Sequence, residues 1–210
     1  MPKQKVPPAA LGPPGALAMP DWQAGGELTA GELRLEQKYQ LQRLRRHLRL
    51  VHGWGVVCGL NIVPAGQGWE LFVCPGYGIG PCGDEIVVPY RYRFNLSDYL
   101  WTRPIGARNR RAWIAVESAE DPAAYESAPP EQCGCGCAGS GEKISRLADS
   151  FRIVTLWTPP LRYGSDFNIC GHGTPRCPPC PDNCALPLAS VVLPAVGEAI
   201  LASAIDNLEY

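Results

Sequence analysis

Three features that would place a chain in a common functional class are missing from this sequence. There is no basic excess for neutralising phosphates, because 19 Lys and Arg stand against 20 Asp and Glu, which argues against a nucleic-acid-binding protein. No stretch approaches the roughly 18 consecutive apolar residues of a membrane-spanning helix. Prolines interrupt residues 1–22, which leaves no apolar run of signal-peptide length. We therefore expect a chain that is made in the cytoplasm and does not span a membrane.

Glycine, proline and cysteine are abundant instead. With 23 Gly and 22 Pro among 210 residues, the sequence predicts many turns and long connections rather than a helical bundle. A hydrophobic fraction of 46% is sufficient for a packed core. The sequence also has 10 cysteines. In the cytosol such side chains are more often thiols or metal ligands than members of a disulfide framework.

The chain begins with a proline-rich arm. Residues 1–26 have too little apolar bulk to pack on themselves, and their prolines exclude a helix. We therefore expect an extended arm that is held by neighbouring subunits.

A helix is expected next, over residues 29–52. Thr29 and Glu32 form a capping box, and Gly53 ends the pattern. One face is apolar, with Leu33, Leu41, Leu44, Leu48 and Val51 at helical spacing. The opposite face is basic, with Arg34, Lys38, Arg45 and Arg49. This basic face is either a solvated surface or a docking surface for an acidic partner subunit.

Beyond the helix the apolar period changes to two, which predicts strands separated by Gly and Pro turns. We expect a mainly β domain over 27–205, a sandwich or a partly open barrel, with a short helix at 95–101 and a tail at 206–210. The expected strands are 54–63, 69–74, 77–80, 84–89, 111–118, 151–157, 188–194 and 198–205.

Two insertions between these strands, 119–149 and 158–187, contain most of the cysteines. Both are too polar and too rich in Gly and Pro to fold alone, and a structural zinc ion can supply about 10–16 kcal/mol of binding free energy. The spacing of Cys177 and Cys180 is typical of a zinc knuckle, and two cysteines of the CGCGC run could complete the site. We expect a zinc-binding subdomain with the candidate ligands Cys133, Cys135, Cys137, Cys170, His172, Cys177, Cys180 and Cys184.

Other uses of the cysteines stay open. The same ligands would suffice for two zinc ions, and disulfides between the insertions become the better interpretation for a protein that works outside the cell. An iron–sulfur cluster fits poorly because no run has a common ferredoxin spacing. Cys58, Cys74 and Cys82 lie in or beside strands and are expected to be small buried apolar side chains. Spacing alone does not show whether Cys58 and Cys82 are bonded.

Two motifs carry a resemblance to a known family. "HLRLVHGWGVVCGLNIV" (47–63) is followed by "VCPGYGIGPCGDEIVVP" (73–89), then by Ser145–Arg146 after the CGCGC run. With these motifs and the Cys177–Cys180 pair the chain resembles small proteins encoded beside phage-tail-like contractile injection systems. The resemblance covers 27–205 and is specific over 44–89, with departures from the usual pattern at Leu48 and Gly80. It implies a structural component of the baseplate, its surrounding shell or a fibre attachment in an extracellular particle.

We therefore expect a non-enzymatic assembly protein whose partners are neighbouring subunits. A cytosolic zinc-ribbon-like adaptor is a first alternative, which the scarcity of basic residues around the cysteines disfavours. A metal- or thiol-dependent enzyme is a second, but adjacent acids such as Asp84 and Glu85 point to opposite faces of a strand. Carbohydrate binding through exposed tryptophans is conceivable, although burial in the core is the favoured interpretation of Trp69, Trp101 and Trp157.

Overall fold

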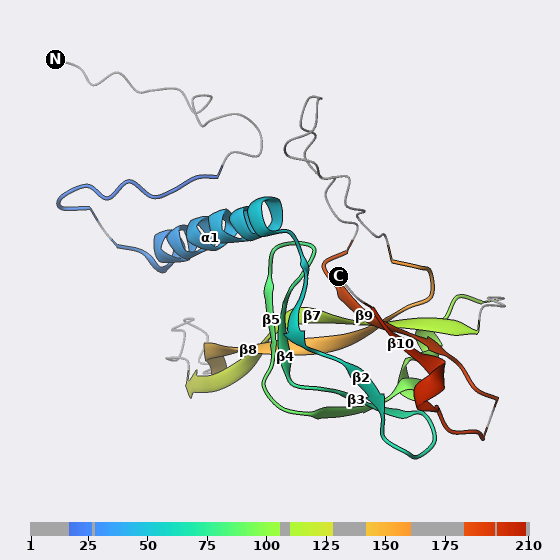
Figure 1. Ribbon diagram of the computed structural model, residues 1–210. Coiled ribbons are helices and arrows are strands. Elements are labelled where there is room, and N and C mark those ends of the chain that lie inside the picture. Colours follow the sequence, from blue (N-terminus) through green and yellow to red (C-terminus); the bar gives the residue numbers. More distant parts are fainter. Residues whose placement is uncertain are drawn as a thin grey trace, which may run out of the picture.

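In the computed structural model of this chain, one long helix precedes a body of β-strands (Figure 1). The structure describes residues 17–26, 28–105, 110–127, 142–160, 183–195 and 197–208. Within these ranges the chain is mainly β, as expected, and its strands form three antiparallel sheets. None of the helices in these ranges is long and apolar enough to cross a bilayer.

Helix α1 (Ala30–His47) begins at the predicted capping box. The Thr29 hydroxyl accepts a hydrogen bond from the Glu32 N–H at 3.2 Å, and the Glu32 carboxylate accepts one from the Thr29 N–H at 3.4 Å. These two bonds satisfy backbone donors that a helix start would otherwise leave without a partner. A π-helical turn, η2 (Leu48–His52), follows, and Gly53 at φ +79° ends it. The helix therefore starts and stops at the residues that the sequence pattern indicates.

The strands pair locally, so that each sheet is built mostly from neighbours in the sequence. The first sheet has the order β1 (Gly55–Gly59), β4 (Gly76–Ile79), β5 (Glu85–Val88). The second has the order β2 (Ile62–Pro64), β3 (Glu70–Val73), β6 (Tyr92–Asn95). The third has the order β10 (Ile205–Asn207), β9 (Leu186–Val192), β7 (Arg111–Ser127), β8 (Glu142–Leu156).

The single strand expected over 54–63 is two strands, β1 and β2. Gly59 and Leu60 both have left-handed backbones, at φ +64° and +59°, and this turn moves the chain from the first sheet to the second. A Cβ on Gly59 would lie 2.0 Å from the carbonyl oxygen of Pro75, so glycine is required there for space as well as for conformation. Within this turn the Leu60 side chain is buried, at 1% exposed, whereas Gly59 is exposed.

Other boundaries also differ from the expectation. Strand β7 continues to Ser127, and strand β8 already begins at Glu142. Both strands therefore extend well into the insertion expected at 119–149. The strand expected at 198–205 is wrong: a 3-10 turn, η4 (Ala202–Ala204), precedes the short β10. The short helix expected at 95–101 is confirmed as the 3-10 helix η3 (Leu96–Thr102). Strand β6 was not expected.

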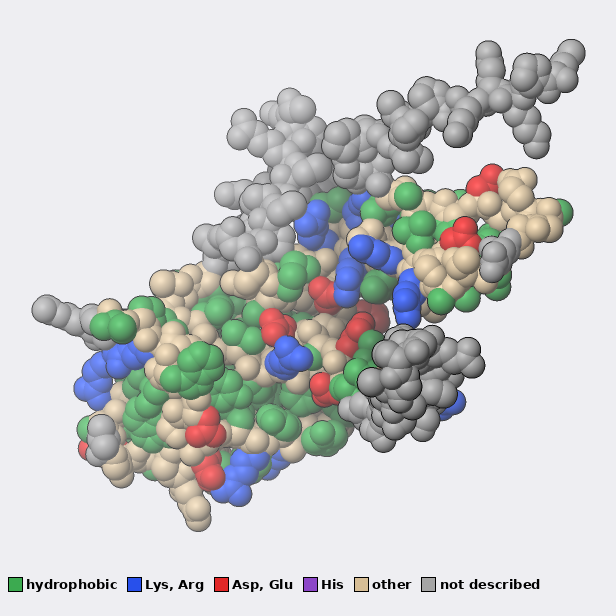
Figure 2. Space-filling view, turned by 180° about the vertical axis from the view of Figure 1, so that it is seen from behind, with side chains coloured by type: hydrophobic (Ala, Val, Ile, Leu, Met, Phe, Trp, Pro, Cys, Tyr) green, Lys and Arg blue, Asp and Glu red, His purple; other side chains and the backbone are tan. Residues whose placement is uncertain are grey.

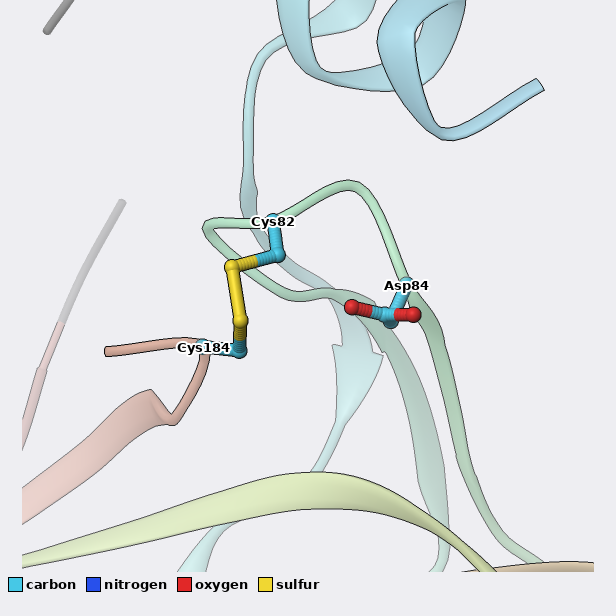
Figure 3. Close-up of side chains that lie close together, drawn as sticks. All are labelled: Cys82, Asp84 and Cys184. Carbon is cyan, nitrogen blue, oxygen red and sulfur yellow. A yellow bond between two sulfur atoms is a disulfide. The ribbon is translucent and has the colours of Figure 1, made fainter. Parts of the chain in front are cut away.

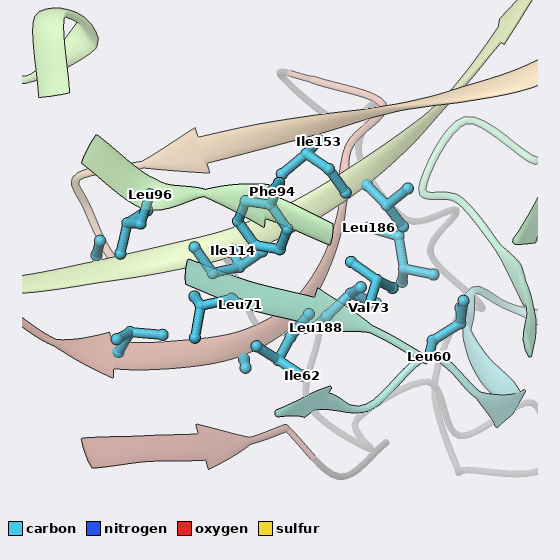
Figure 4. Close-up of a cluster of buried hydrophobic side chains, with 14 of the residues drawn as sticks. Leu60, Ile62, Leu71, Val73, Phe94, Leu96, Ile114, Ile153, Leu186 and Leu188 are labelled. Atoms are coloured by element: carbon cyan, nitrogen blue, oxygen red, sulfur yellow. The ribbon is translucent and has the colours of Figure 1, made fainter. Parts of the chain in front are cut away.

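All three sheets contribute to one buried cluster (Figure 4). Its fully buried members include Ile62, Leu71, Ile86, Ile114, Leu186 and Val191. Trp157 closes one part of the cluster, and its indole N–H donates to the Thr102 hydroxyl at 2.8 Å. The Asn207 side chain joins two sheets, because it accepts from the N–H of Ile62 at 2.7 Å and donates to the carbonyl of the same residue at 3.1 Å. Helix α1 contributes no residue to this core.

Candidate functional site

The turn between β4 and β5 holds helix α1 on the body. Gly83, at φ +86°, packs so closely on the helix that a Cβ there would lie 2.1 Å from the carbonyl oxygen of Arg45. The next residue, Asp84, forms an ion pair with the Arg45 guanidinium at 2.5 Å. Two backbone hydrogen bonds shape the turn, from the Gly83 N–H to Gly80 at 2.8 Å and from the Gly80 N–H to Asp84 at 2.8 Å. A short turn of the second sequence motif is thus the support for the end of α1.

A disulfide ties the same turn to the start of β9 (Figure 3). Cys82 and Cys184 are bonded, with a Cα–Cα distance of 5.0 Å and a sequence separation of 102 residues. This corrects two expectations, since Cys184 was expected to be a zinc ligand and Cys82 a buried thiol. The Asp84 carboxylate and the two sulfur atoms lie within 4.8 Å of one another. Cysteine binds zinc as a thiolate, however, and a disulfide-bonded sulfur is no thiolate, so in this state the group is a covalent crosslink.

The other cysteines differ in how far the structure describes them. Cys58 is exposed and Cys74 half-buried, so the expectation of buried apolar side chains is wrong for Cys58. A β-bulge between Val56 and Cys58 shifts the alternation on which that expectation rested. The remaining candidate ligands lie outside the described residues, and they are Cys133, Cys135, Cys137, Cys170, His172, Cys177 and Cys180.

The apolar face of α1 is exposed rather than packed on the body. Leu33 is 44% exposed, Leu41 41%, Leu44 48% and Val51 61%, and no residue of α1 is buried. The helix pattern predicted which side chains share a face. The described part of the chain does not bury that face. A surface of this kind is typical of a protein that binds other chains.

The four basic residues expected on the opposite face have different environments. Arg34 and Lys38 are exposed. Arg45 is engaged by Asp84, and Arg49 is half-buried and interacts within the chain. The structure therefore brings only the first two together as an exposed basic pair, and Arg45 instead anchors the helix.

A groove of about 190 Å³ lies between α1 and the sheets. Figure 2 shows basic and acidic side chains meeting in this region, where the helix lies over the body. The helix contributes Leu41, Leu44, Arg45 and Leu48, and the turn before β5 contributes Gly83, Asp84 and Glu85. Ser118, Glu120 and Asp149 line it from the β7–β8 hairpin. Sequence analysis did not single out this acidic wall, because its members come from three separate segments.

A second hollow, of about 350 Å³, lies over β3 and β6. Glu70 and Arg93 form an ion pair across these strands, which neutralises part of its charge. Burial, followed by the charges of Tyr92 and Asp98, raises the pKa of Tyr99 above its ordinary 10.0, so this phenol stays protonated at neutral pH. The lining residues include neither a histidine nor a cysteine.

The three tryptophans considered for carbohydrate binding do not share a site. Trp157 is buried in the core at 9% exposure, and Trp69 is half-buried and packs against that core. Trp101 is 84% exposed. Only Trp101 is therefore accessible in the way that sugar stacking would require.

The described residues thus offer a supported helix with an exposed apolar face, an acidic groove beside it and a second, charge-paired hollow. Neither groove lining includes a histidine or a cysteine, which are common as the base and the nucleophile of nucleophilic catalysis. No protein-family model matches this chain, and no curated protein is significantly similar to it in sequence.

Proposed function

We propose that this chain is a non-catalytic assembly component of a contractile injection particle, in the baseplate, its surrounding shell or a fibre attachment. The observation that carries the proposal is helix α1. It has 18 residues, none of them buried, and its leucines are more than two-fifths exposed at Leu33, Leu41 and Leu44. An isolated helix gains most of its stability from packing, so such a face is best explained by contact with another subunit.

The arrangement of the two sequence motifs supports this role. Residues of the first motif form β1 and residues of the second form β4 and β5, and these strands pair in one sheet. The second motif also includes Gly83 and Asp84, which hold Arg45 of α1. The residues on which the resemblance rests therefore build a platform for the helix. Support for an exposed helix is useful to a protein that binds other subunits. In an enzyme family, the motifs that members share would more often contain residues of the reaction site.

We propose in addition that the cysteine-rich insertions bind a structural zinc ion. The donor set, six cysteines and one histidine once Cys184 is paired with Cys82, fits the ligand preference of zinc. Metal analysis of the purified chain should give one zinc per chain, and serine at both Cys177 and Cys180 should abolish it. Retention of the full zinc content in that variant would exclude the knuckle as the site.

In this proposal the chain is made in the cytoplasm and leaves the cell as part of the particle. The Cys82–Cys184 disulfide is compatible with working in an oxidising exterior, where disulfides persist. The sheets would enclose the core as a sandwich or partly open barrel, and partners would be neighbouring subunits rather than nucleic acid or a small substrate.

The test is incorporation of helix variants into particles. Leu33→Glu and Val51→Glu change residues of the apolar face that are 44% and 61% exposed and that do not line the groove. The loss of one interface contact worth about 2 kcal/mol should lower the copies per particle by more than tenfold. Leu201→Glu, at a residue 65% exposed outside the helix, is the matched control. Quantitative mass spectrometry of purified particles gives the copy number. Unchanged incorporation of both helix variants, or particles that never contain this chain, would refute the proposal.

A further inference from the structure

Three potential metal ligands meet where the turn between β4 and β5 contacts the start of β9. The sulfur atoms of Cys82 and Cys184 and a carboxylate oxygen of Asp84 all lie within 4.8 Å of one another. Figure 3 shows the Asp84 carboxylate beside the disulfide. In a tetrahedral zinc site with bonds of about 2.0–2.3 Å, neighbouring ligand atoms are about 3.3–3.8 Å apart. Once the S–S bond is broken, small movements of these side chains therefore suffice to place one ion among them.

The two segments are held together by packing as well as by the disulfide. A Cβ on Gly80 would lie 3.0 Å from the carbonyl oxygen of Cys184. A Cβ on Gly78 would lie 2.6 Å from a methyl carbon of Leu186. Leu186 is fully buried in the core, which fixes the start of β9 two residues after Cys184. Because this close approach does not depend on the S–S bond, we expect the two thiols of the reduced chain to stay within reach of one ion.

Asp84 is positioned as a ligand by the turn and by helix α1. Its carbonyl accepts a hydrogen bond from the Gly80 N–H at 2.8 Å, which fixes the backbone. The Arg45 guanidinium pairs with Oδ1 of the carboxylate at 2.5 Å and leaves the second oxygen available to an ion. Metal-binding carboxylates usually have such an outer partner, which orients them. A zinc ion with two thiolates and one carboxylate has one net negative charge, and the Arg45 guanidinium balances it.

The surroundings of the three side chains also suit zinc. Cys82 and Asp84 are half-buried and Cys184 is exposed, so an ion can enter from solvent. Thiolate ligands favour zinc over magnesium or calcium, which prefer oxygen. Three protein ligands leave the fourth zinc position to a water molecule. The described free thiols, Cys58 and Cys74, are not part of this group.

We propose that Cys82, Cys184 and Asp84 form a redox-dependent zinc site. In the reduced chain the two thiolates and the carboxylate bind one zinc ion. In the oxidised chain the same two sulfur atoms form the disulfide, and the ion is released. This site is separate from the one proposed for the insertions, which uses neither Cys82 nor Asp84.

Both changes of state are thiol–disulfide exchange reactions. A dithiol reductant gives two electrons to the S–S bond, which yields two cysteine thiols and the disulfide of the reductant. Zinc then displaces the two thiol protons. In the reverse direction a disulfide oxidant takes two electrons from the bound thiolates and leaves as two thiolates, while the S–S bond forms and Zn²⁺ dissociates. The inference rests on the proposed function for its setting, since a reducing cytoplasm favours the zinc form and an oxidising exterior the disulfide.

The first test is alkylation of the full chain after reduction by a phosphine, with and without added zinc, followed by peptide mapping. Zinc should slow the alkylation of Cys82 and Cys184 by at least about tenfold, because a zinc-bound sulfur is no longer a free thiolate nucleophile. Cys58, which is exposed and unpaired, is the internal control and should react equally fast in both samples. Equal rates with and without zinc at Cys82 and Cys184 would overturn the proposal. Protection of Cys184 without Cys82 would do the same, because it would assign Cys184 to the insertions.

The second test concerns the carboxylate. Asp84→Asn should raise the zinc concentration for half-protection at least about tenfold, since loss of even an outer partner costs about 10–100-fold in metal affinity. Glu85→Gln is the matched control, because it removes the neighbouring carboxylate of the same turn, which is outside the group. Equal effects of the two variants would refute Asp84 as a ligand. Circular dichroism shows whether each variant is folded, and the alkylation test on the wild-type chain needs no variant.

Metal analysis separates this site from the one proposed for the insertions. The Cys177→Ser/Cys180→Ser variant should contain no zinc when oxidised and one zinc ion per chain when reduced. No gain of zinc on reduction would overturn the redox-dependent site. Normal incorporation into particles without zinc protection of Cys82 would refute this site alone. Zinc protection in a chain that never enters particles would refute the assembly function and leave this site standing.

Discussion

Replacing both Cys82 and Cys184 by serine removes a crosslink between residues that are 102 positions apart. The crosslink joins the turn that supports α1 to Cys184, which lies just before β9. In the folded state it therefore connects two segments that the rest of the fold already holds close together. Its effect is therefore expected mainly in the unfolded chain, where the bond forbids most conformations of the long loop. We expect the double variant to fold to the same structure with a lower free energy of unfolding.

The size of this effect follows from the loop length. In the chain-entropy treatment a closed loop of about 100 residues contributes about 4.7 kcal/mol at 25 °C. For a chain of 150–250 residues, 1 kcal/mol corresponds to about 2–4 °C in Tm, so the expected decrease is about 9–19 °C. A loop of about 15 residues would contribute only about 3 kcal/mol, so the long separation of Cys82 and Cys184 makes this bond an effective one.

The assay is guanidinium unfolding followed by tryptophan fluorescence, with a chelator present so that metal binding does not contribute. The wild-type chain under a thiol reductant should match the double variant, because both lack the bond. Cys58→Ser is the control, since Cys58 is exposed and unpaired in the structure. Alkylation under denaturing conditions, followed by peptide mapping, identifies the bonded pair directly. An unfolding free energy within about 1 kcal/mol of wild type in the double variant would refute the reasoning, as would a map in which Cys82 is alkylated without reduction.

Two further predictions concern the support of α1. Gly83→Ala should cost about 1–2 kcal/mol for the left-handed backbone alone and should also displace Arg45, so that limited proteolysis between α1 and β1 becomes faster than in wild type; an unchanged cleavage rate would argue against the close contact. Burial, followed by the hydrogen bond and charge of Glu85, raises the pKa of Tyr77 above 10.0. The folded state thus favours the protonated phenol, so stability is fully present below pH 10 and is lost as the pH rises through the folded-state pKa. In Tyr77→Phe, the unfolding free energy measured from pH 9 to 12 should fall less steeply, and an identical slope would be evidence against the shift.

The start and end of α1 could be predicted because local hydrogen bonds determine them. The capping box at Thr29 and Glu32 and the glycine at Gly53 act within a few residues of the backbone that they terminate. The exposure of the leucine face could not be predicted in the same way. An amphipathic pattern shows that a face prefers an apolar environment, but whether the same chain or another one provides it depends on tertiary packing.

The cysteine pattern also shows that contacts between distant parts of the sequence could not be predicted. Spacing indicates ligands that lie close in sequence, such as Cys177 and Cys180, whereas Cys82 and Cys184 meet only because β4, β5 and β9 pack around one core. The exposure of Cys58 was missed because a bulge interrupts the alternation of β1. The acidic wall of the groove was missed because Glu120 was assigned to a loop, while it lies on the long strand β7.

The length of the β7–β8 hairpin has a consequence for local motion. Near Trp113 and Leu156 its strands are covered by β9 and the core, but from Glu120 and Asp149 outward the pair is exposed and β7 has no described strand on its other side. A two-stranded ribbon is only marginally stable by itself, so the outer part should open and close without unfolding the rest. Amide hydrogen exchange should therefore become faster along β7 toward Ser127. Glu120 and Asp149 lie at the point where this opening begins. A segment bound to them would therefore hold the two strands together and slow amide exchange in the whole outer hairpin.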